Sequence, residues 1–185
     1  MAKESEEESN LTSGRQRGTD DAFTGRSAQL TAIVELLRRR CNAAIPEVDL
    51  GTDLFAFRDD RGEMARVQVK ACATPRTYAD GSGYSARFSL PLKQLKQGER
   101  VPELFYVLAV LRADQWCDFL IVSQSRLKAI LGDGQPFGFA NPKNDELQLT
   151  IEFRDDVRCS GKDLTDYRNA WESLPPFRSV EVHSI

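Results

Sequence analysis

Apolar and polar residues alternate along the chain with two periods, and these predict a helix followed by a series of strands. Apolar residues recur every three or four positions over residues 27–40, which is the period of an amphipathic helix. The apolar stripe of that helix consists of Leu30, Ile33, Val34 and Leu37. Strands are predicted at residues 43–48, 54–58, 64–71 and 84–90, the first at a sheet edge because it contains Pro46.

The second half of the chain contains two continuous apolar runs, at residues 104–111 and 119–122. Runs of this kind are typical of strands buried in the middle of a sheet. A further strand is predicted at residues 147–153, and helices at 91–96, 126–131 and 162–174. Ser123 or Ser125 caps the helix at 126–131, and Gly132 ends it. This order of elements predicts an α/β fold with a mixed central β-sheet flanked by helices.

The chain is long enough for one domain with short appendages. Residues 1–22 are acidic and then carry glycine and arginine, with too little apolar surface to offset the entropy lost on ordering. We therefore expect a disordered N-terminal tail at 1–22, a single α/β domain at 23–175 and a flexible C-terminal tail at 176–185.

The amino-acid composition bears on cellular location, on nucleic-acid binding and on zinc binding. The net charge is −3, so any contact with nucleic acid depends on a local basic patch or on a partner. The four cysteines lie far apart and the single histidine is His183, which disfavours a zinc site and indicates reduced thiols. The sequence shows no apolar run of about 18 residues and no secretory leader, so we expect a cytoplasmic protein that does not enter a membrane.

Candidate chemistry is concentrated in two neighbouring strands. Asp53 opens the strand at 54–58, and Gln68, Val69 and Lys70 lie in the next strand. Gln68 and Lys70 are two residues apart, so their side chains share one face. Pairing of the two strands as a hairpin brings Asp53 beside them. An acid, an amide oxygen and a lysine in one place suit a divalent cation and a phosphate.

These residues resemble the signature of the PD-(D/E)xK nuclease superfamily, most closely its small bacterial branch of Holliday-junction-resolvase-like and defence-associated nucleases. The resemblance spans residues 25–131 and rests on the helix at 27–40, on Gly51-Thr52-Asp53 and on Gln68-Val69-Lys70. It implies a restriction-endonuclease-like fold and metal-dependent hydrolysis of DNA in anti-phage defence. It also implies catalytic roles for Asp53, Gln68 and Lys70, with Mg²⁺ or Mn²⁺ held by Asp53, Gln68 and the Val69 carbonyl.

Two positions depart from the superfamily pattern. Gln68 stands where most members have Glu or Asp, and Gln29 stands where the early helix commonly supplies another acid. Glu35 lies on the other side of that helix. Asp49 either compensates for the missing charge or only shapes the turn at Gly51. The neutral amides favour an alternative function, a catalytically weak or inactive subunit that assembles with an ATPase or helicase partner.

Residues near the motifs supply candidates for substrate binding. Arg66, Arg76 and Lys93 suit phosphates, and Tyr78 suits stacking on a base. Purely structural interpretations stay open: Asp53 as a turn cap, Lys70 as a solvated strand-end lysine, and the cations as a mixed-charge surface. The helix at 162–174 carries an apolar stripe that includes Trp171. That stripe covers either the domain's own sheet or another copy of the chain in a homo-oligomer.

Overall fold

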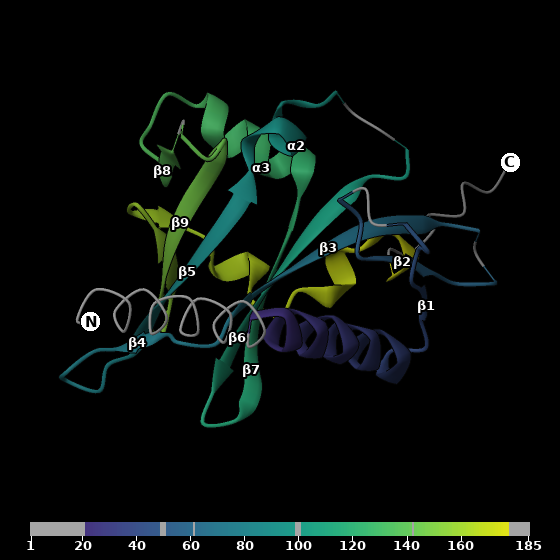
Figure 1. The fold of residues 1–185 in the computed structure, drawn as a ribbon, viewed down its shortest axis with the longest axis horizontal. Coiled ribbons are helices and arrows are strands. Elements are labelled where there is room, and N and C mark those ends of the chain that lie inside the picture. Colours follow the sequence, from purple (N-terminus) through teal and green to yellow (C-terminus); the bar gives the residue numbers. More distant parts are fainter. Residues whose placement is uncertain (1–20, 49–50, 61, 99–100, 142, 178–185) are drawn as a thin grey trace, which may run out of the picture.

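Two β-sheets packed face to face form the body of the molecule (Figure 1). The computed structural model describes residues 21–48, 51–60, 62–98, 101–141 and 143–177. The first sheet has the order β1-β2-β3-β6-β7, with β1 Asn42–Ala44, β2 Leu54–Phe57, β3 Met64–Cys72, β6 Leu104–Arg112 and β7 Gln115–Ser123. The second has the order β11-β10-β9-β5-β4, with β4 Arg76–Thr77, β5 Tyr84–Pro91, β9 Glu146–Phe153, β10 Val157–Cys159 and β11 Lys162–Asp163, and β8 Phe139–Asn141 pairs with β9.

The first sheet is mixed, because β3 and β6 run parallel while the other neighbouring pairs are antiparallel. β6 lies between β3 and β7, and its residues from Leu104 to Val110 are buried. A strand covered on both faces has no solvent side, which explains the continuous apolar run in the sequence. The predicted central strand is therefore confirmed.

The second sheet is antiparallel and buries one face. Along β5, Tyr84, Ala86, Phe88 and Leu90 are buried and alternate with the polar residues Ser85, Arg87 and Ser89. The buried side chains join those of β9 and of the first sheet in one apolar core between the sheets. The alternation in the sequence thus predicts both β5 and β9 correctly.

Two short helices follow strands of different sheets and pack on the same core. α2 Leu92–Lys96 follows β5, and α3 Gln124–Gly132 follows β7 (Figure 1). Leu95 of α2 and Leu127 of α3 belong to the core between the sheets. The cap of α3 is Ser123, whose hydroxyl accepts the N–H of Arg126 at 3.2 Å. Both predicted helices are confirmed, but α3 includes Gly132, and its C-cap residue is Asp133 rather than the predicted Gly132.

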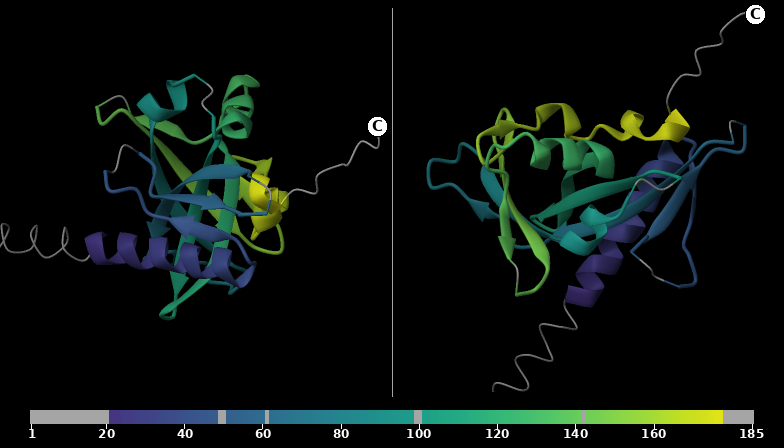
Figure 2. Two further views of the ribbon diagram at one scale, coloured as in Figure 1. Left: turned by 90° about the vertical axis from the view of Figure 1, so that its right-hand side faces the viewer. Right: turned by 90° about the horizontal axis from the view of Figure 1, so that it is seen from above.

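The helix at residues 21–38 packs on the first sheet, but mostly through residues other than the predicted ones (Figure 2). Its buried residues are Ala28, Ala32 and Leu36, whereas Leu30, Val34 and Leu37 are 46%, 51% and 53% exposed. The predicted core stripe is wrong at these three positions, whereas its fourth member, Ile33, is half-buried and packs against the core. Alanines allow the helix backbone to approach the sheet closely, so the larger neighbours on the other face point to solvent.

The C-terminal segment is not the helix predicted at residues 162–174. It contains β11 and three 3₁₀ turns, η1 Thr165–Tyr167, η2 Trp171–Ser173 and η3 Pro175–Phe177, drawn in yellow along one side of the molecule in Figure 2. Asn169 interrupts any helix, because its φ is +54° and its N–H donates to the Phe119 carbonyl at 2.6 Å. Trp171 and Leu174 are buried within the chain's own core. The apolar spacing therefore marks core residues correctly without a helix.

A partly buried ion pair anchors this segment to both sheets. Arg168 Nε donates to Asp118 Oδ1 at 2.7 Å, and the Tyr84 hydroxyl donates to Oδ2 of the same carboxylate. Burial and the adjacent Asp118 carboxylate raise the pKa of Tyr84 far above its usual range. Tyr84 therefore remains a hydrogen-bond donor throughout the neutral range of pH.

The predicted α/β class with a mixed central sheet is confirmed. Residues 21–22 and 176–177, which the sequence analysis assigns to tails, belong to the described structure, where Pro176 is buried. The remainder of each predicted tail lies outside the described residues. No helix in the described ranges has the length and apolar character needed to cross a bilayer.

Candidate active site

Asp53 precedes β2 and uses its carboxylate to extend the hydrogen bonding of the first sheet. Its N–H donates to the Val67 carbonyl at 2.9 Å, and its Oδ2 accepts the N–H of Val69 at 2.6 Å. The polar backbone groups of Val67 point toward β2, so those of Val69, two residues further along β3, point the same way. The register of β2 ends at Leu54 opposite Val67. The Asp53 carboxylate therefore replaces the backbone carbonyl that a longer β2 would offer to the Val69 N–H.

Gln68 lies inside the protein, next to Val69. It is 6% exposed and pairs in register with Tyr106 of β6. Within the described residues its Oε1 is buried without a hydrogen-bond partner. A buried polar atom without a partner costs about 1–3 kcal/mol. Packing alone gives no reason for this cost, whereas a bound cation would satisfy the oxygen.

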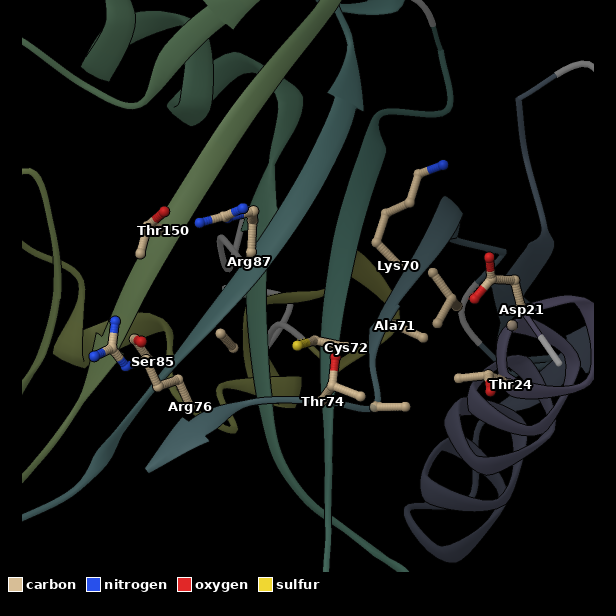
Figure 3. A pocket seen from close by; sticks show the side chains of 14 residues that line it. Asp21, Thr24, Lys70, Ala71, Cys72, Thr74, Arg76, Ser85, Arg87 and Thr150 are labelled. Atoms are coloured by element: carbon tan, nitrogen blue, oxygen red, sulfur yellow. The ribbon is translucent and has the colours of Figure 1, made fainter. Parts of the chain in front are cut away.

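Lys70 follows on the same strand and opens onto a cavity. Its side chain is half-buried and makes no hydrogen bond or ion pair with other described residues. Together with Val69 it lines a cavity of about 690 Å³ (Figure 3). The hydrogen bond from Val69 to Asp53 thus connects the cavity wall to the acid behind it.

Three parts of the molecule form the walls of this cavity. The helix at residues 21–38 contributes Asp21 and Thr24, β3 contributes Lys70, and the second sheet contributes Arg76, Arg87 and Thr150. Figure 3 shows Asp21 and Lys70 on one side and Arg87 and Thr150 on the other. Three cations and one acid line the described part of the cavity. This excess of positive charge suits a polyanion, although the whole chain is acidic.

Side-chain amides support the turn that carries Asp53. Gln29 Nε2 donates to the Asp53 carbonyl at 2.5 Å, and Gln94 Nε2 donates to the Gly51 carbonyl at 2.6 Å. The Tyr106 hydroxyl donates to Gln94 Oε1 at 2.9 Å, and burial raises the pKa of Tyr106 well above its usual range, so the donor is retained. Gly51 has a φ of +88°, and a Cβ there would lie 2.7 Å from Gln94 Nε2. Only glycine suits this turn.

Comparison with known proteins bears on the fold. No protein-family model matches the chain, and no curated protein sequence does. The solved structure of a bacterial homing endonuclease, I-Ssp6803I, is similar with a TM-score of 0.52 and 18% sequence identity, over 82% of this chain and 88% of that chain. The chain has a restriction-endonuclease-like fold. The fold expected from the PD-(D/E)xK resemblance is confirmed, and the branch of the superfamily stays a prediction.

The residues at this point of the restriction-endonuclease-like fold fit a divalent cation in the type of donor atom. Asp53 supplies a carboxylate, Gln68 supplies the buried Oε1, and the Val69 carbonyl points to the same side as its N–H. Hard cations such as Mg²⁺ and Mn²⁺ prefer oxygen donors. Only one of the three donors is charged. Among the described residues, no three acidic, histidine or cysteine side chains lie close enough together to hold a metal ion. We therefore expect a weak site.

Of the four substrate-binding candidates from the sequence, Arg76 lines the cavity. The other three do not line it, for different reasons. Arg66 Nε donates to the Pro102 carbonyl at 2.7 Å, and the ring of Tyr78 is covered by the Arg154 guanidinium at 4.2 Å. Lys93 is exposed on α2.

The structure adds Asp21 to the candidates, which sequence reasoning missed because residue 21 fell in the predicted tail. Asp21 lies eight positions before Gln29, so helical geometry places both on one side of the helix. Extending the helical period backwards from residue 27 would have found it. Glu35 instead binds Arg38 at 2.9 Å and also Arg39. Asp49 lies outside the described residues.

Proposed function

We propose that the protein is a divalent-metal-dependent endonuclease that hydrolyses phosphodiester bonds of DNA. The observation that carries the proposal is the Asp53 carboxylate on the Val69 N–H, with the unpartnered Gln68 Oε1 and the Lys70 side chain at the adjacent positions of β3. The restriction-endonuclease-like fold supports it, as does the similarity to a homing endonuclease. The motif resemblance extends the proposal to foreign DNA in a bacterial cytoplasm.

Asp53, Gln68 and the Val69 carbonyl hold the cation in this proposal. The Asp53 carboxylate is fixed by the Val69 N–H, so binding orders few new side-chain rotations. A divalent cation bound there supplies Lewis-acid polarisation of a phosphodiester. The Gln68 amide contributes an oxygen without charge, which keeps the total negative charge facing a phosphate low.

Lys70 acts on the same phosphate from the next outward position of β3. Its ammonium neutralises charge on a non-bridging oxygen and orients the attacking water. Water adds to phosphorus and passes a proton to solvent, and the bond to the leaving oxygen breaks. That oxygen takes a proton from solvent, so a phosphate monoester and a hydroxyl end remain. Arg76 contacts a flanking phosphate from the opposite wall. Arg66, Tyr78 and Lys93 stay predictions for contacts outside the cavity.

Cleavage assays with the purified full chain test the proposal. Supercoiled plasmid and single-stranded DNA are incubated with Mg²⁺, with Mn²⁺ and with chelator, and we expect cutting only when a metal is present. Lys70→Ala should lower the rate about 100-fold or more, the usual cost of removing a group that stabilises transition-state charge. Lys96→Ala is the matched control, because Lys96 is exposed on α2 and its one ion pair among the described residues is a surface contact with Asp145 at 3.7 Å.

Thermal unfolding of both variants accompanies the assay, so that a rate change is not mistaken for a folding defect. Lys70 is half-buried, and we expect its replacement to leave the melting temperature nearly unchanged. Equal cleavage by wild type and Lys70→Ala would contradict the proposed site. Cleavage that persists in chelator would contradict the role of the metal.

The two neutral amides favour a second candidate function. Gln29 contacts the Asp53 backbone but brings no charge, and Gln68 brings none either. In this alternative the protein is a catalytically weak or inactive subunit that assembles with an ATPase or helicase, or with further copies of itself. Light scattering combined with the cleavage assay separates the two functions. A monomer that cuts DNA unaided excludes the alternative, and an inert wild-type protein favours it.

A further inference from the structure

The outer face of the second sheet is continuous with the candidate active site. Arg87 and Thr150 line the cavity of about 690 Å³ together with Lys70. The same two residues line a second cavity of about 340 Å³ with Phe139 and Gln148. The shared residues make one surface that runs from Lys70 across β5 and β9 to β8. A ligand that binds at Lys70 and extends beyond it therefore meets this surface.

Two cross-strand rows lie at the centre of this face, and the rows on either side of them contain Glu152 and Glu146. Arg87 pairs with Thr150 in one row, and Ser89, Gln148 and Phe139 form the other. Neither row contains an acid, and Arg87 makes no hydrogen bond or ion pair with other described residues. Phe139 is 65% exposed. A cation without a partner and an exposed aromatic ring, side by side on a polar face, point to a ligand rather than to an ordinary solvated sheet.

The middle of this face is a ribbon only two strands wide. β4 pairs with residues 84–85 of β5, β10 with residues 151–153 of β9, and β8 with residues 146–148 of β9. Among the described strands, β5 and β9 therefore pair only with each other at Arg87 and Thr150. A two-stranded antiparallel ribbon fits the major groove of B-DNA, which is about 12 Å wide.

The side chains of the two rows also match the groups that a major groove exposes. Arginine donates two hydrogen bonds to guanine, glutamine pairs with adenine through its amide, and threonine and phenylalanine contact the thymine methyl group. The net charge of −3 leaves little sequence-independent attraction to phosphates. Affinity for DNA then depends on contacts to the bases.

We propose that the centre of β5 and β9 reads the sequence of duplex DNA through the major groove, while Lys70 faces the phosphate to be cut. The inference rests on the proposed function, since it takes DNA as the substrate of the same cavity. It goes further by making the protein sequence-specific and by assigning Arg87, Gln148 and Thr150 to the selection of the target.

Selection from a pool of random duplexes tests the inference without requiring cleavage. The full-length Lys70→Ala protein is incubated with the pool, bound duplexes are recovered and sequenced, and we expect a motif of several base pairs to be enriched. Affinity for the enriched duplex is then compared with affinity for a scrambled one. Arg87→Ala and Gln148→Ala should each reduce this preference about 5- to 150-fold, the discrimination given by one bidentate contact.

Two further variants distinguish a loss of base recognition from a loss of positive charge. Arg87→Lys keeps the charge but loses the planar fork, so it should bind scrambled duplex as before and lose the preference. Arg38→Ala removes a cation from the helix at residues 21–38, where Arg38 is exposed and pairs with Glu35. It should change neither affinity.

The outcomes for binding and for cleavage are independent. A pool without enrichment, or tighter binding of single-stranded DNA or of RNA, overturns the inference. An enriched motif together with no metal-dependent cleavage supports the inference and overturns the proposed function. If the wild-type protein cleaves unrelated sequences at equal rates, the proposed function is supported and the inference is overturned.

Discussion

The two walls of the cavity differ in how their polar groups are held. Behind the β3 wall two groups are held in place, although neither lines the cavity: the Asp53 carboxylate accepts the Val69 N–H, and Gln68 is almost fully buried. Lys70, on the wall itself, is half-buried and has no partner among the described residues. On the β5–β9 wall the groups are exposed, and Arg87 has no partner among the described residues. Asp53 and Gln68 behind the β3 wall are thus arranged before a ligand arrives, whereas the side chains on the β5–β9 wall become ordered by the ligand.

This difference separates chemistry from recognition. Buried dipoles that need no reorganisation stabilise developing charge far better than solvated ones. Exposed side chains give up water and rotamer freedom on binding, so they contribute only where the ligand fits them well. Substitutions on the β3 wall should therefore lower the rate at constant affinity. Substitutions on the β5–β9 wall should lower affinity at constant rate.

The largest effect is expected from Asp53→Ala. Cleavage should fall about 100-fold or more, as for other groups that stabilise transition-state charge. The free energy of unfolding should fall by about 1–3 kcal/mol, because the Val69 N–H loses its acceptor. Plasmid nicking and urea unfolding measure the two effects. Asp53→Asn keeps an acceptor for Val69 and should recover stability but not cleavage; full activity in this variant would refute the role of Asp53 in metal binding.

A gain is expected from Gln68→Glu, next to Val69 on β3. In the proposed site the substitution adds a second carboxylate to that of Asp53, so Mn²⁺ should bind about tenfold more tightly. Titration calorimetry on the full chain measures the affinity, and cleavage at limiting metal should rise with it. An unchanged Mn²⁺ affinity would show that the Gln68 side chain does not face the cation.

A smaller effect is expected from Arg76→Ala on the opposite wall. Arg76 contacts phosphate rather than bases in the proposed complex, so its loss should weaken binding of all sequences to a similar extent. The slope of log affinity against log salt concentration should fall by about 1. Fluorescence anisotropy at several salt concentrations measures both quantities. A loss confined to one sequence would mean that Arg76 belongs with Arg87 and Gln148.

The smallest effect is expected from Gln68→Met, a change that keeps the length of the side chain and removes its polar atoms. Stability should rise by about 1 kcal/mol, because the buried Oε1 no longer lacks a partner. Metal affinity should fall at the same time. A variant that is less stable than wild type would mean that Gln68 is satisfied in the free protein, and the β3 wall would then not be preorganised for a cation.

The pairing of β2 with β3 could be anticipated from the sequence because the two strands are consecutive and joined by a short turn. The convergence of the Asp53, Gln68 and Lys70 side chains stays a prediction. The β5–β9 wall could not be anticipated. Period-two alternation shows that Arg87 and Thr150 face outward, but not that their strands are neighbours, since the partner of a strand is set by tertiary packing.

The two errors in the helices have a related cause. Periodicity identifies residues that can share a face. It does not show which face is buried, nor whether the backbone that brings the residues together is an α-helix. In the helix at residues 21–38 the small residues face the sheet. In the C-terminal segment, 3₁₀ turns and a left-handed Asn169 bring Trp171 and Leu174 to the core.

The alanines of the first helix have a consequence beyond packing. Ala28 and Ala32 face the sheet, and Gln29 beside them spans only 2.5 Å to the Asp53 carbonyl. A larger side chain at either alanine would push the helix outward and stretch that hydrogen bond. The small side chains of Ala28 and Ala32 therefore help to fix the position of Asp53. A search for relatives by matching acids and lysines would pass over these two positions, although they set how closely the helix can support the metal ligand.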